Sequence, residues 1–154
     1  KPVEPGAGDA VYRRSLYTYI KRTAPPPSMV TLDAGSREIC QPRRLNTNTP
    51  LQALIFLNDL SFFESARGLA QRCIREKPEN STAQLTHAFQ ILTSRAPRAG
   101  ETTALTELYQ TQLAQYEKDR ATAKSIAGAD DPHLAAMTIV CSTLLTSDAA
   151  ITSR

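Results

Sequence analysis

The stretch that decides the fold is RRLNTNTPLQALIFLND, residues 43–59. Within it Thr49 is a good helix N-cap, because its hydroxyl oxygen can accept a hydrogen bond from a free backbone N–H. Pro50 suits the first helical position, where its missing N–H is not needed, and Gln52 completes a capping box. The sequence therefore predicts a helix that begins at Pro50 and ends just before Asp59.

This helix is apolar around most of its circumference. The residues that give it this character are Leu51, Leu54, Ile55 and Leu57. We expect them to pack the helix against other protein, which makes its polar flanks the unusual part of the stretch.

Two more helices are predicted downstream of residues 43–59. Ser61 and Glu64 form a second capping box for a helix that runs to about Glu76, and Ser81 with Gln84 starts another after a break at 78–80. The apolar stripe of the first is Phe62, Ala66, Leu69, Ala70 and Cys73. The stripe of the second is Leu85, Ala88, Phe89 and Leu92.

The C-terminal part of the chain predicts a long helix and a central one. The long helix spans about 101–123, behind a turn at 95–100. Asp131 caps the last helix with Pro132 at its first position. The last helix is apolar nearly all round, which indicates that it lies at the centre of a bundle. Its apolar residues are Leu134, Met137, Ile139, Val140, Cys141, Leu144 and Leu145.

The N-terminal part is less regular. Residues 1–10 are poor in apolar side chains and resemble a linker tail that follows another domain. Residues 12–20 carry apolar side chains at helical spacing and predict a short helix. The prolines at 25–27 favour extended backbone, and 29–40 is expected to be an ordered loop that lies on the helices.

Together these features predict an all-α protein, an irregular bundle of about five to six helices with an ordered N-terminal loop segment. Residues 11–154 are long enough to form a single helical domain with its own hydrophobic core. No apolar run approaches the roughly 20 residues that a membrane-spanning helix needs. Residue 1 is not preceded by a start Met or a signal peptide, which is typical of a piece processed from a longer protein.

The net charge of +3 is concentrated in the first third of the chain. Residues 1–50 hold eight Lys and Arg against four Asp and Glu, whereas residues 51–154 hold ten against eleven. Such an excess is compatible with binding an anionic polymer, or with Arg side chains that hold an irregular segment in place. The recognition motifs of nucleic-acid-binding proteins are absent, so nucleic acid is a poor candidate partner.

No metal or cofactor site is predicted. Cys40, Cys73 and Cys141 are too far apart for zinc or haem motifs, and Cys73 and Cys141 fall in apolar helical patterns that predict core positions. Cys40 precedes two arginines, which leaves open a reactive thiol or a disulfide. His87 has no partner at a metal-binding interval, and no nucleotide-binding or hydrolase motif is present. His133 follows Asp130 and Asp131, which could form an Asp-His group but is also the ordinary pattern of a helix cap.

One polar cluster carries the candidate functional residues. Its members are Asp33, Arg37, Glu38, Arg43, Arg44, Asn46, Asn48, Asn58 and Asp59. Two carboxylates near Arg and amide groups can act as general acid and base, or orient a sugar or an anionic group. The same side chains can instead satisfy loop backbone groups and form ion pairs, so the catalytic residues stay unknown.

Three stretches carry a resemblance to a known family. They are YRRSLYT (12–18), KRTAPPPSM (21–29) and the opening stretch, 43–59. With them the chain resembles the planctomycete-type domain of unknown function numbered fifteen fifty-three. The resemblance implies the C-terminal domain of a large exported or periplasmic protein, often one that also carries a c-type cytochrome module. It implies no activity and no cofactor.

Three functions therefore remain open. The first is an accessory or interaction module that docks on upstream domains of the same polypeptide through the N-terminal polar loop. The second is part of an enzyme site formed between domains, acting on polysaccharide or in a redox process. The third is binding of an anionic polymer through Arg13, Arg14, Lys21, Arg22, Arg43 and Arg44.

Overall fold

The structure is a computed structural model that describes residues 12, 17–21, 23–35 and 47–151. Within these ranges the chain is helical, with one isolated bridge between Lys21 and Ala24 in place of any sheet. The predicted all-α class is confirmed. The helices are α1 (Pro27–Thr31), α2 (Pro50–Asn58), α3 (Leu60–Glu76), α4 (Ser81–Thr93), α5 (Ala99–Lys118), α6 (Arg120–Ala127), α7 (Pro132–Leu145) and α8 (Asp148–Ile151).

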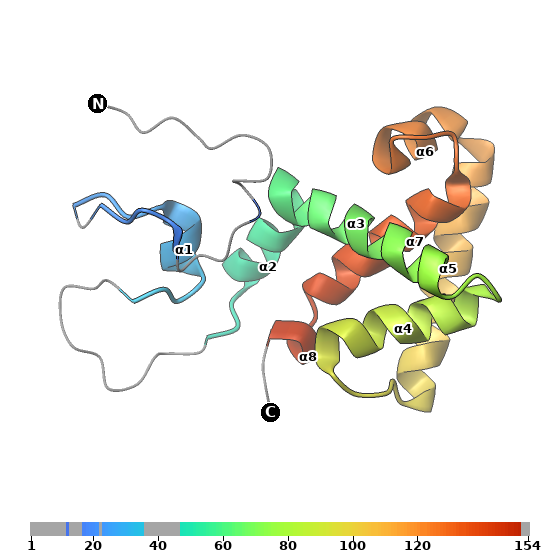
Figure 1. Ribbon diagram of the computed structural model, residues 1–154, viewed down its shortest axis with the longest axis horizontal. Helices are drawn as coiled ribbons and strands as arrows, with labels where there is room; N and C mark the ends of the chain where they lie inside the picture. Colours follow the sequence, from blue (N-terminus) through green and yellow to red (C-terminus); the bar gives the residue numbers. More distant parts are fainter. Residues whose placement is uncertain (1–11, 13–16, 22, 36–46, 152–154) are drawn as a thin grey trace.

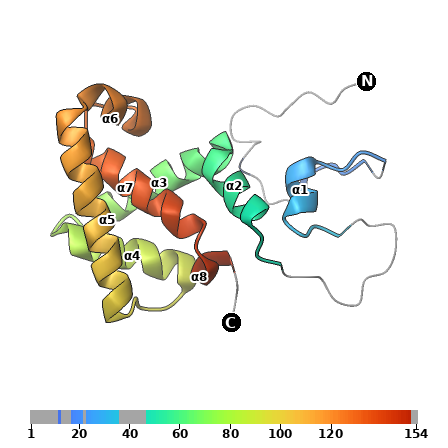
Figure 2. The same ribbon diagram turned by 180° about the vertical axis from the view of Figure 1, so that it is seen from behind.

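Helix α7 lies at the centre of the bundle, as its all-round apolar pattern predicts. Helices α3, α4, α5 and α6 all pack against it (Figures 1 and 2). Asp131 caps it by accepting a hydrogen bond from the Leu134 backbone N–H, and Pro132 occupies its first turn. Its fully buried residues are Ala135, Ala136, Met137, Thr138, Val140 and Cys141.

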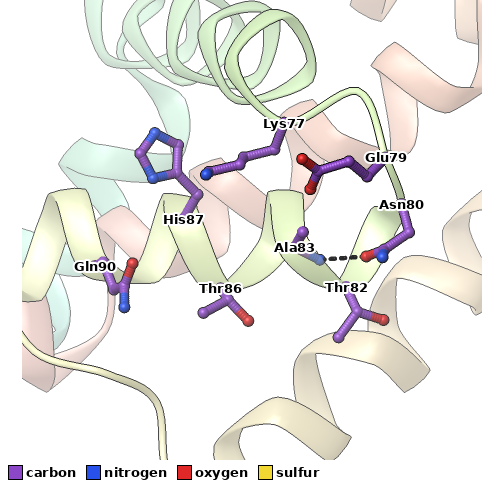
Figure 3. A pocket seen from close by; sticks show the side chains of 8 residues that line it. All are labelled: Lys77, Glu79, Asn80, Thr82, Ala83, Thr86, His87 and Gln90. Carbon is purple, nitrogen blue, oxygen red and sulfur yellow. Dashed lines mark hydrogen bonds between the residues drawn. The ribbon is translucent and has the colours of Figure 1, made fainter.

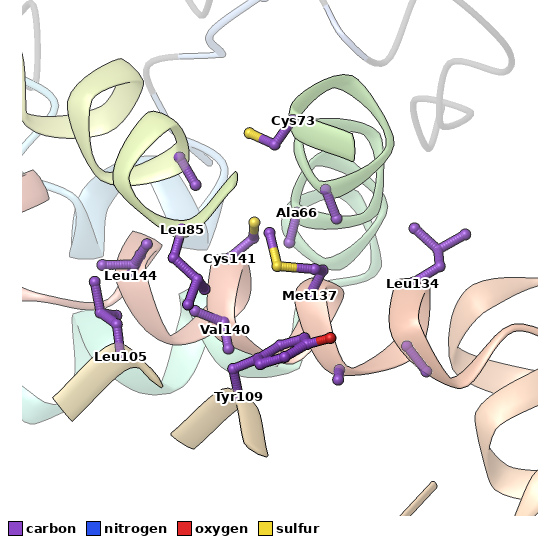
Figure 4. Close-up of a cluster of buried hydrophobic side chains, with 14 of the residues drawn as sticks. Ala66, Cys73, Leu85, Leu105, Tyr109, Leu134, Met137, Val140, Cys141 and Leu144 are labelled. Atoms are coloured by element: carbon purple, nitrogen blue, oxygen red, sulfur yellow. The ribbon is translucent and has the colours of Figure 1, made fainter. Parts of the chain in front are cut away.

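Small residues let α3 approach α7 closely. Ala66, Ala70 and Cys73 recur at helical spacing along α3, and all three are fully buried. Figure 4 shows Ala66 and Cys73 facing Met137 and Cys141 of α7 across this interface. Both cysteines are free thiols in the core, as predicted. Burial raises the pKa of the Cys73 thiol to about 11, so it stays protonated at neutral pH.

The junction of α2 and α3 differs from the predicted one. The capping box of Thr49 and Gln52 forms at the start of α2. The predicted box of Ser61 and Glu64 does not start α3, because Asp59 takes the N-cap position and its carboxylate accepts from the Ser61 backbone N–H at 2.8 Å. One residue therefore ends α2 and begins α3, which fixes the corner between the two helices.

The burial expected for α2 is largely wrong. Ile55 is half-buried, but the three leucines of the helix, Leu51, Leu54 and Leu57, are exposed to solvent. Only one face of α2, which carries Gln52 and Phe56, meets the rest of the described chain. The exposed fractions are 58% for Leu51, 53% for Leu54, 48% for Leu57 and 69% for Leu60, the first residue of α3.

Helix α4 begins one residue earlier than the predicted cap. Its N-cap is Asn80, whose side-chain oxygen accepts from the Ala83 N–H at 2.7 Å. Gln84 does not complete a capping box with Ser81, because its buried amide donates to the Lys77 carbonyl oxygen at the end of α3. Gln84 thus connects two helices.

The predicted helix over 101–123 is two helices. Asp119 interrupts it, since its carboxylate accepts from the Thr122 N–H and caps α6. The start of α5 lacks a Ser or Thr cap, but Glu101 accepts from the Arg98 N–H at 2.7 Å and from the Arg95 guanidinium at 2.6 and 2.8 Å. An ion pair therefore secures this helix start.

The N-terminal part contains a helix where a loop was predicted. Pro27 begins α1, and the residue before it, Pro26, is extended. Proline is tolerated in the first turn because no intrahelical donor is needed there, so the proline run leads into a helix, with Pro27 as its first residue, instead of excluding one. Helix α1 lies beyond α2 and contacts the bundle through it (Figures 1 and 2).

The helix predicted over residues 12–20 does not reach residue 20. Residues 18–20 are not helical, and Tyr17 and Tyr19 are both exposed. The Ala24 N–H donates to the Lys21 carbonyl oxygen, which turns the chain just after this segment. An apolar stripe stabilises a short helix only when packing buries it, and Tyr17, a member of this stripe, is exposed.

Candidate functional site

The candidate site begins at Asp33, just after α1. Its backbone φ is 59°, in the left-handed region that asparagine and aspartate tolerate best among non-glycine residues. The carboxylate accepts a hydrogen bond from the Thr47 backbone N–H at 2.7 Å and from the Thr47 hydroxyl at 2.7 and 3.0 Å. Asp33 therefore brings together two segments that are fourteen residues apart in the sequence.

Gln52 connects this carboxylate to α2. It is 2% exposed, and its amide nitrogen lies within hydrogen-bonding distance of three acceptors, Thr31 O, Asp33 Oδ2 and Thr47 Oγ1, at 2.9, 3.2 and 2.9 Å. An amide group has two hydrogens, so these acceptors share them. The amide oxygen accepts from the Thr49 N–H at 2.9 Å. The sequence predicts Gln52 only as a capping residue, and its reach across to α1 carries no sequence signal.

Asp33 carries a negative charge at neutral pH. The backbone N–H of Thr47, then the Thr47 hydroxyl and the Gln52 amide, lower the pKa of its carboxyl below the usual value, while partial burial opposes them. No Lys or Arg of the described residues forms an ion pair with it. Hydrogen bonds from neutral donors leave the full charge in place.

A hollow of about 350 Å³ lies beside this network. Asp33, Thr47 and Gln52 form its polar side. Its apolar side is contributed by Leu32, Phe56, Leu92, Leu145, Ala150 and Ile151. Side chains from α2, α4, α7 and α8 thus meet the end of α1 at one place, close to where Figures 1 and 2 show α8 beside α4.

The other predicted site residues divide into two groups. Asn48 donates to Asp148 Oδ1 of α8 at 3.0 Å, Asn58 donates to the Leu54 carbonyl oxygen, and Asp59 caps α3. The structure brings Asp33 and Asn48 to the same region, while Asn58 and Asp59 lie at the other end of α2. Five residues lie outside the described ranges, namely Arg37, Glu38, Arg43, Arg44 and Asn46.

The same limit applies to the basic residues and to Cys40. Lys21 is exposed, and Arg13, Arg14 and Arg22 lie outside the described ranges, as does Cys40. Among the described residues, no group of three or more His, Cys, Asp or Glu side chains is placed to hold a metal ion. In the same part of the chain, no helix combines the length and apolar character needed to cross a bilayer.

A second, larger hollow of about 490 Å³ runs along α4 (Figure 3). It is polar, with Lys77, Glu79 and Gln90 among its lining residues and Ala83 as its apolar member. His87 also lines it and pairs with Glu76 at 2.8 Å. Because apolar walls with a few convergent polar groups characterise ligand sites, the hollow beside Asp33 fits that description better.

His133 takes part in a partly buried contact that the sequence did not predict. Its Nδ1 lies 2.6 Å from the Tyr109 hydroxyl, and the two rings meet edge to face. Burial raises the pKa of Tyr109, so its hydroxyl remains protonated. Asp131, the neighbouring carboxylate, is engaged as the cap of α7. This pairing joins α5 to α7.

Comparison of the sequence with models of known families assigns the chain to one of them. The model of the family described as "PSD1: Protein of unknown function (DUF1553)" matches residues 2–109. The match ends within α5, so α6, α7 and α8 lie beyond it. No curated protein and no solved structure matches the chain.

Proposed function

Because this chain belongs to the DUF1553 family of proteins of unknown function, we propose that it is an accessory module of a larger polypeptide and docks on an upstream domain of it. The docking surface is the outer face of α2, defined here as Leu51, Leu54, Leu57 and Leu60. The proposal includes the exported or periplasmic location that the family resemblance implies.

The observation that carries this proposal is the exposure of these four leucines, each about half or more open to solvent. Single exposed leucines are common, but four of them on one short helix and the corner after it gather exposed apolar surface in one region of the chain. Full burial of a leucine side chain is worth about 1.5–3 kcal/mol. A partner that covers the outer face of α2 would gain a substantial part of this free energy.

The position of Tyr12 favours an upstream segment as the partner. Its hydroxyl donates to the Glu64 carboxylate in α3, one turn beyond Leu60. The chain therefore enters the described structure at the corner that carries the exposed leucines. A domain attached ahead of Tyr12 would be held near the outer face of α2 at a high effective concentration.

The test is binding between this chain and the separately expressed upstream region of the same polypeptide, measured by isothermal titration calorimetry. The variant Leu51→Ser/Leu54→Ser is expected to weaken binding at least about tenfold, since it removes two apolar contacts. Gln110→Ser/Gln115→Ser, two exposed positions on α5, is the matched control and is expected to bind like the wild type. Circular dichroism verifies that each variant is folded.

Two results would contradict the proposal. One is the absence of any association between the folded chain and the upstream region. The other is equal affinity for the leucine variant and the α5 control, which would place the contact on a different surface.

A further inference from the structure

We propose that the hollow beside Asp33 is a binding site for a small amphipathic cation, a molecule with an amine or guanidinium head and an apolar body. The site lies on the inner side of α2, where Gln52 and Phe56 are four residues apart and share a face. It is therefore distinct from the outer face of α2, and this inference does not depend on the docking proposal.

The shape and lining of the hollow identify the apolar part of the ligand. Its volume of about 350 Å³ falls in the range of sites for small organic molecules. Leu92, Leu145 and Ile151 contribute aliphatic surface from three helices, and Phe56 adds an aromatic ring. Water in contact with such walls gains few hydrogen bonds, so an apolar group that displaces it is favoured.

The charge of Asp33 identifies the head group. Its carboxylate lies at the side of the hollow, and its hydrogen-bond donors among the described residues are the neutral groups of Thr47 and Gln52. No cationic side chain of the described residues neutralises it. A carboxylate next to low-dielectric walls attracts a cation more strongly than a solvated one, and disfavours an anion by the same reasoning.

The site is also held in position before a ligand arrives. Thr47 and Gln52 fix the carboxylate from two directions, and Gln52 is itself held by Thr31 and Thr49. A fixed charge loses little conformational freedom when it binds, which favours affinity. The left-handed backbone of Asp33 is retained by the same contacts.

Three probes of matched shape test the assignment: 4-phenylbutylamine, 4-phenylbutanol and 4-phenylbutanoate. Binding to the chain is followed by ¹H–¹⁵N correlation spectra, with the Gln52 side-chain amide and the Ala150 and Ile151 backbone amides as reporters. The amine is expected to bind with a dissociation constant of about 1 mM, a value reasonable for so small a ligand. It is expected to bind about tenfold more tightly than the alcohol, and the acid most weakly.

Two variants separate the charge from the cavity. Asp33→Asn is expected to remove the preference for the amine over the alcohol while both still bind. Ala150→Phe is expected to abolish binding of all probes, because the larger side chain fills the hollow. The hydrogen bonds of Asp33 with Thr47 and Gln52 are expected to remain in this variant. Ala121→Phe, at an exposed position on α6, is the matched control and is expected to bind like the wild type.

The inference is overturned by any of three results. These are no binding of the amine at about 10 mM, ten times the expected dissociation constant; equal binding of amine, alcohol and acid; and chemical-shift changes remote from Gln52 and Ile151. If Asp33→Asn disturbs the Thr47 and Gln52 contacts, the Ala150→Phe variant still decides whether the hollow is the site. The results of the docking test with the leucine variant do not affect the outcome of these ligand-binding measurements.

Discussion

The side-chain amide of Gln52 donates a hydrogen bond to the backbone carbonyl of Thr31, 2.9 Å away, and so ties α2 to the end of α1. The two residues are twenty-one positions apart. Because α1 contacts the bundle mainly through α2, this contact is central to the placement of the N-terminal segment.

Replacing Gln52 should release that segment. Gln52→Leu changes the side-chain volume little but leaves Thr31 O and the Thr49 N–H without their partner. Leaving a buried donor or acceptor unsatisfied costs about 1–3 kcal/mol in folding free energy. We expect faster hydrogen exchange at Leu32 and Asp33, measured by NMR, with α7 still protected. Gln71→Leu, an exposed position on α3, is the control and should leave the exchange rates of Leu32 and Asp33 unchanged. Unchanged exchange in Gln52→Leu would contradict this account.

The Glu101 ion pair should make stability depend on acid pH. Arg95, followed by the Arg98 N–H, lowers the pKa of the Glu101 carboxyl from 4.5 to about 2. The folded state therefore holds the ionised form more tightly than the unfolded state, so its contribution is complete above pH 4.5 and is lost as pH falls toward 2.

Urea unfolding from pH 7 to pH 2 measures this contribution. Glu101→Gln should be less stable than the wild type at pH 7, and the difference should shrink as pH falls below about 5. Glu107→Gln, at an exposed position on the same helix, serves as the control. A difference that stays constant across this pH range would argue against the ion pair as the cause.

Truncation of the central helix should be costly. Met137 is fully buried against α3, and Met137→Ala removes several methylene-sized groups and leaves a cavity. Such changes cost about 2–5 kcal/mol in the free energy of unfolding, measured by chemical denaturation. Thr143→Ala on the exposed side of α7 should change it by less than about 0.5 kcal/mol. Equal effects would mean that α7 is not the core helix.

Two glycines should respond in opposite directions to alanine. Gly128 ends α6 with φ at 76°, and an added Cβ would lie 3.3 Å from an Arg67 nitrogen, so Gly128→Ala should destabilise the fold by about 1 kcal/mol. Gly68 lies within α3 with open space around its Cα, so Gly68→Ala should stabilise it by about 0.5–1 kcal/mol. Thermal unfolding distinguishes them, and a stabilising Gly128→Ala would contradict the assigned backbone.

The parts of the fold that the sequence predicts well are those with strong local signals. Thr49 and Pro50 start α2, and Asp131 and Pro132 start α7, because an N-cap followed by proline determines a helix start within a few residues. The centrality of α7 follows from its composition. The N-cap role of Asp59 was assigned to Ser61, because both are good capping residues next to the predicted break. The break at Asp119 was missed because a continuous helical pattern runs through it.

The candidate site was less predictable, since it depends on contacts between distant segments. Asp33 was selected from the sequence for its polar surroundings, but its partners Thr47 and Gln52 were not selected with it. The apolar side of the hollow includes residues of α4, α7 and α8, and no local pattern shows that these helices meet α2. The outer leucines of α2 were expected to be buried because composition records how apolar a helix is, and not which side its neighbours cover.

The order of the helices along the sequence has a consequence for how the core is completed during synthesis. Ala66, Ala70 and Cys73 of α3 reach their burial against a helix that begins more than fifty residues later in the sequence. Before α7 has been synthesised, the earlier helices lack the surface on which they close. The α3 side of the core is therefore completed only after the chain has been extended through residue 145.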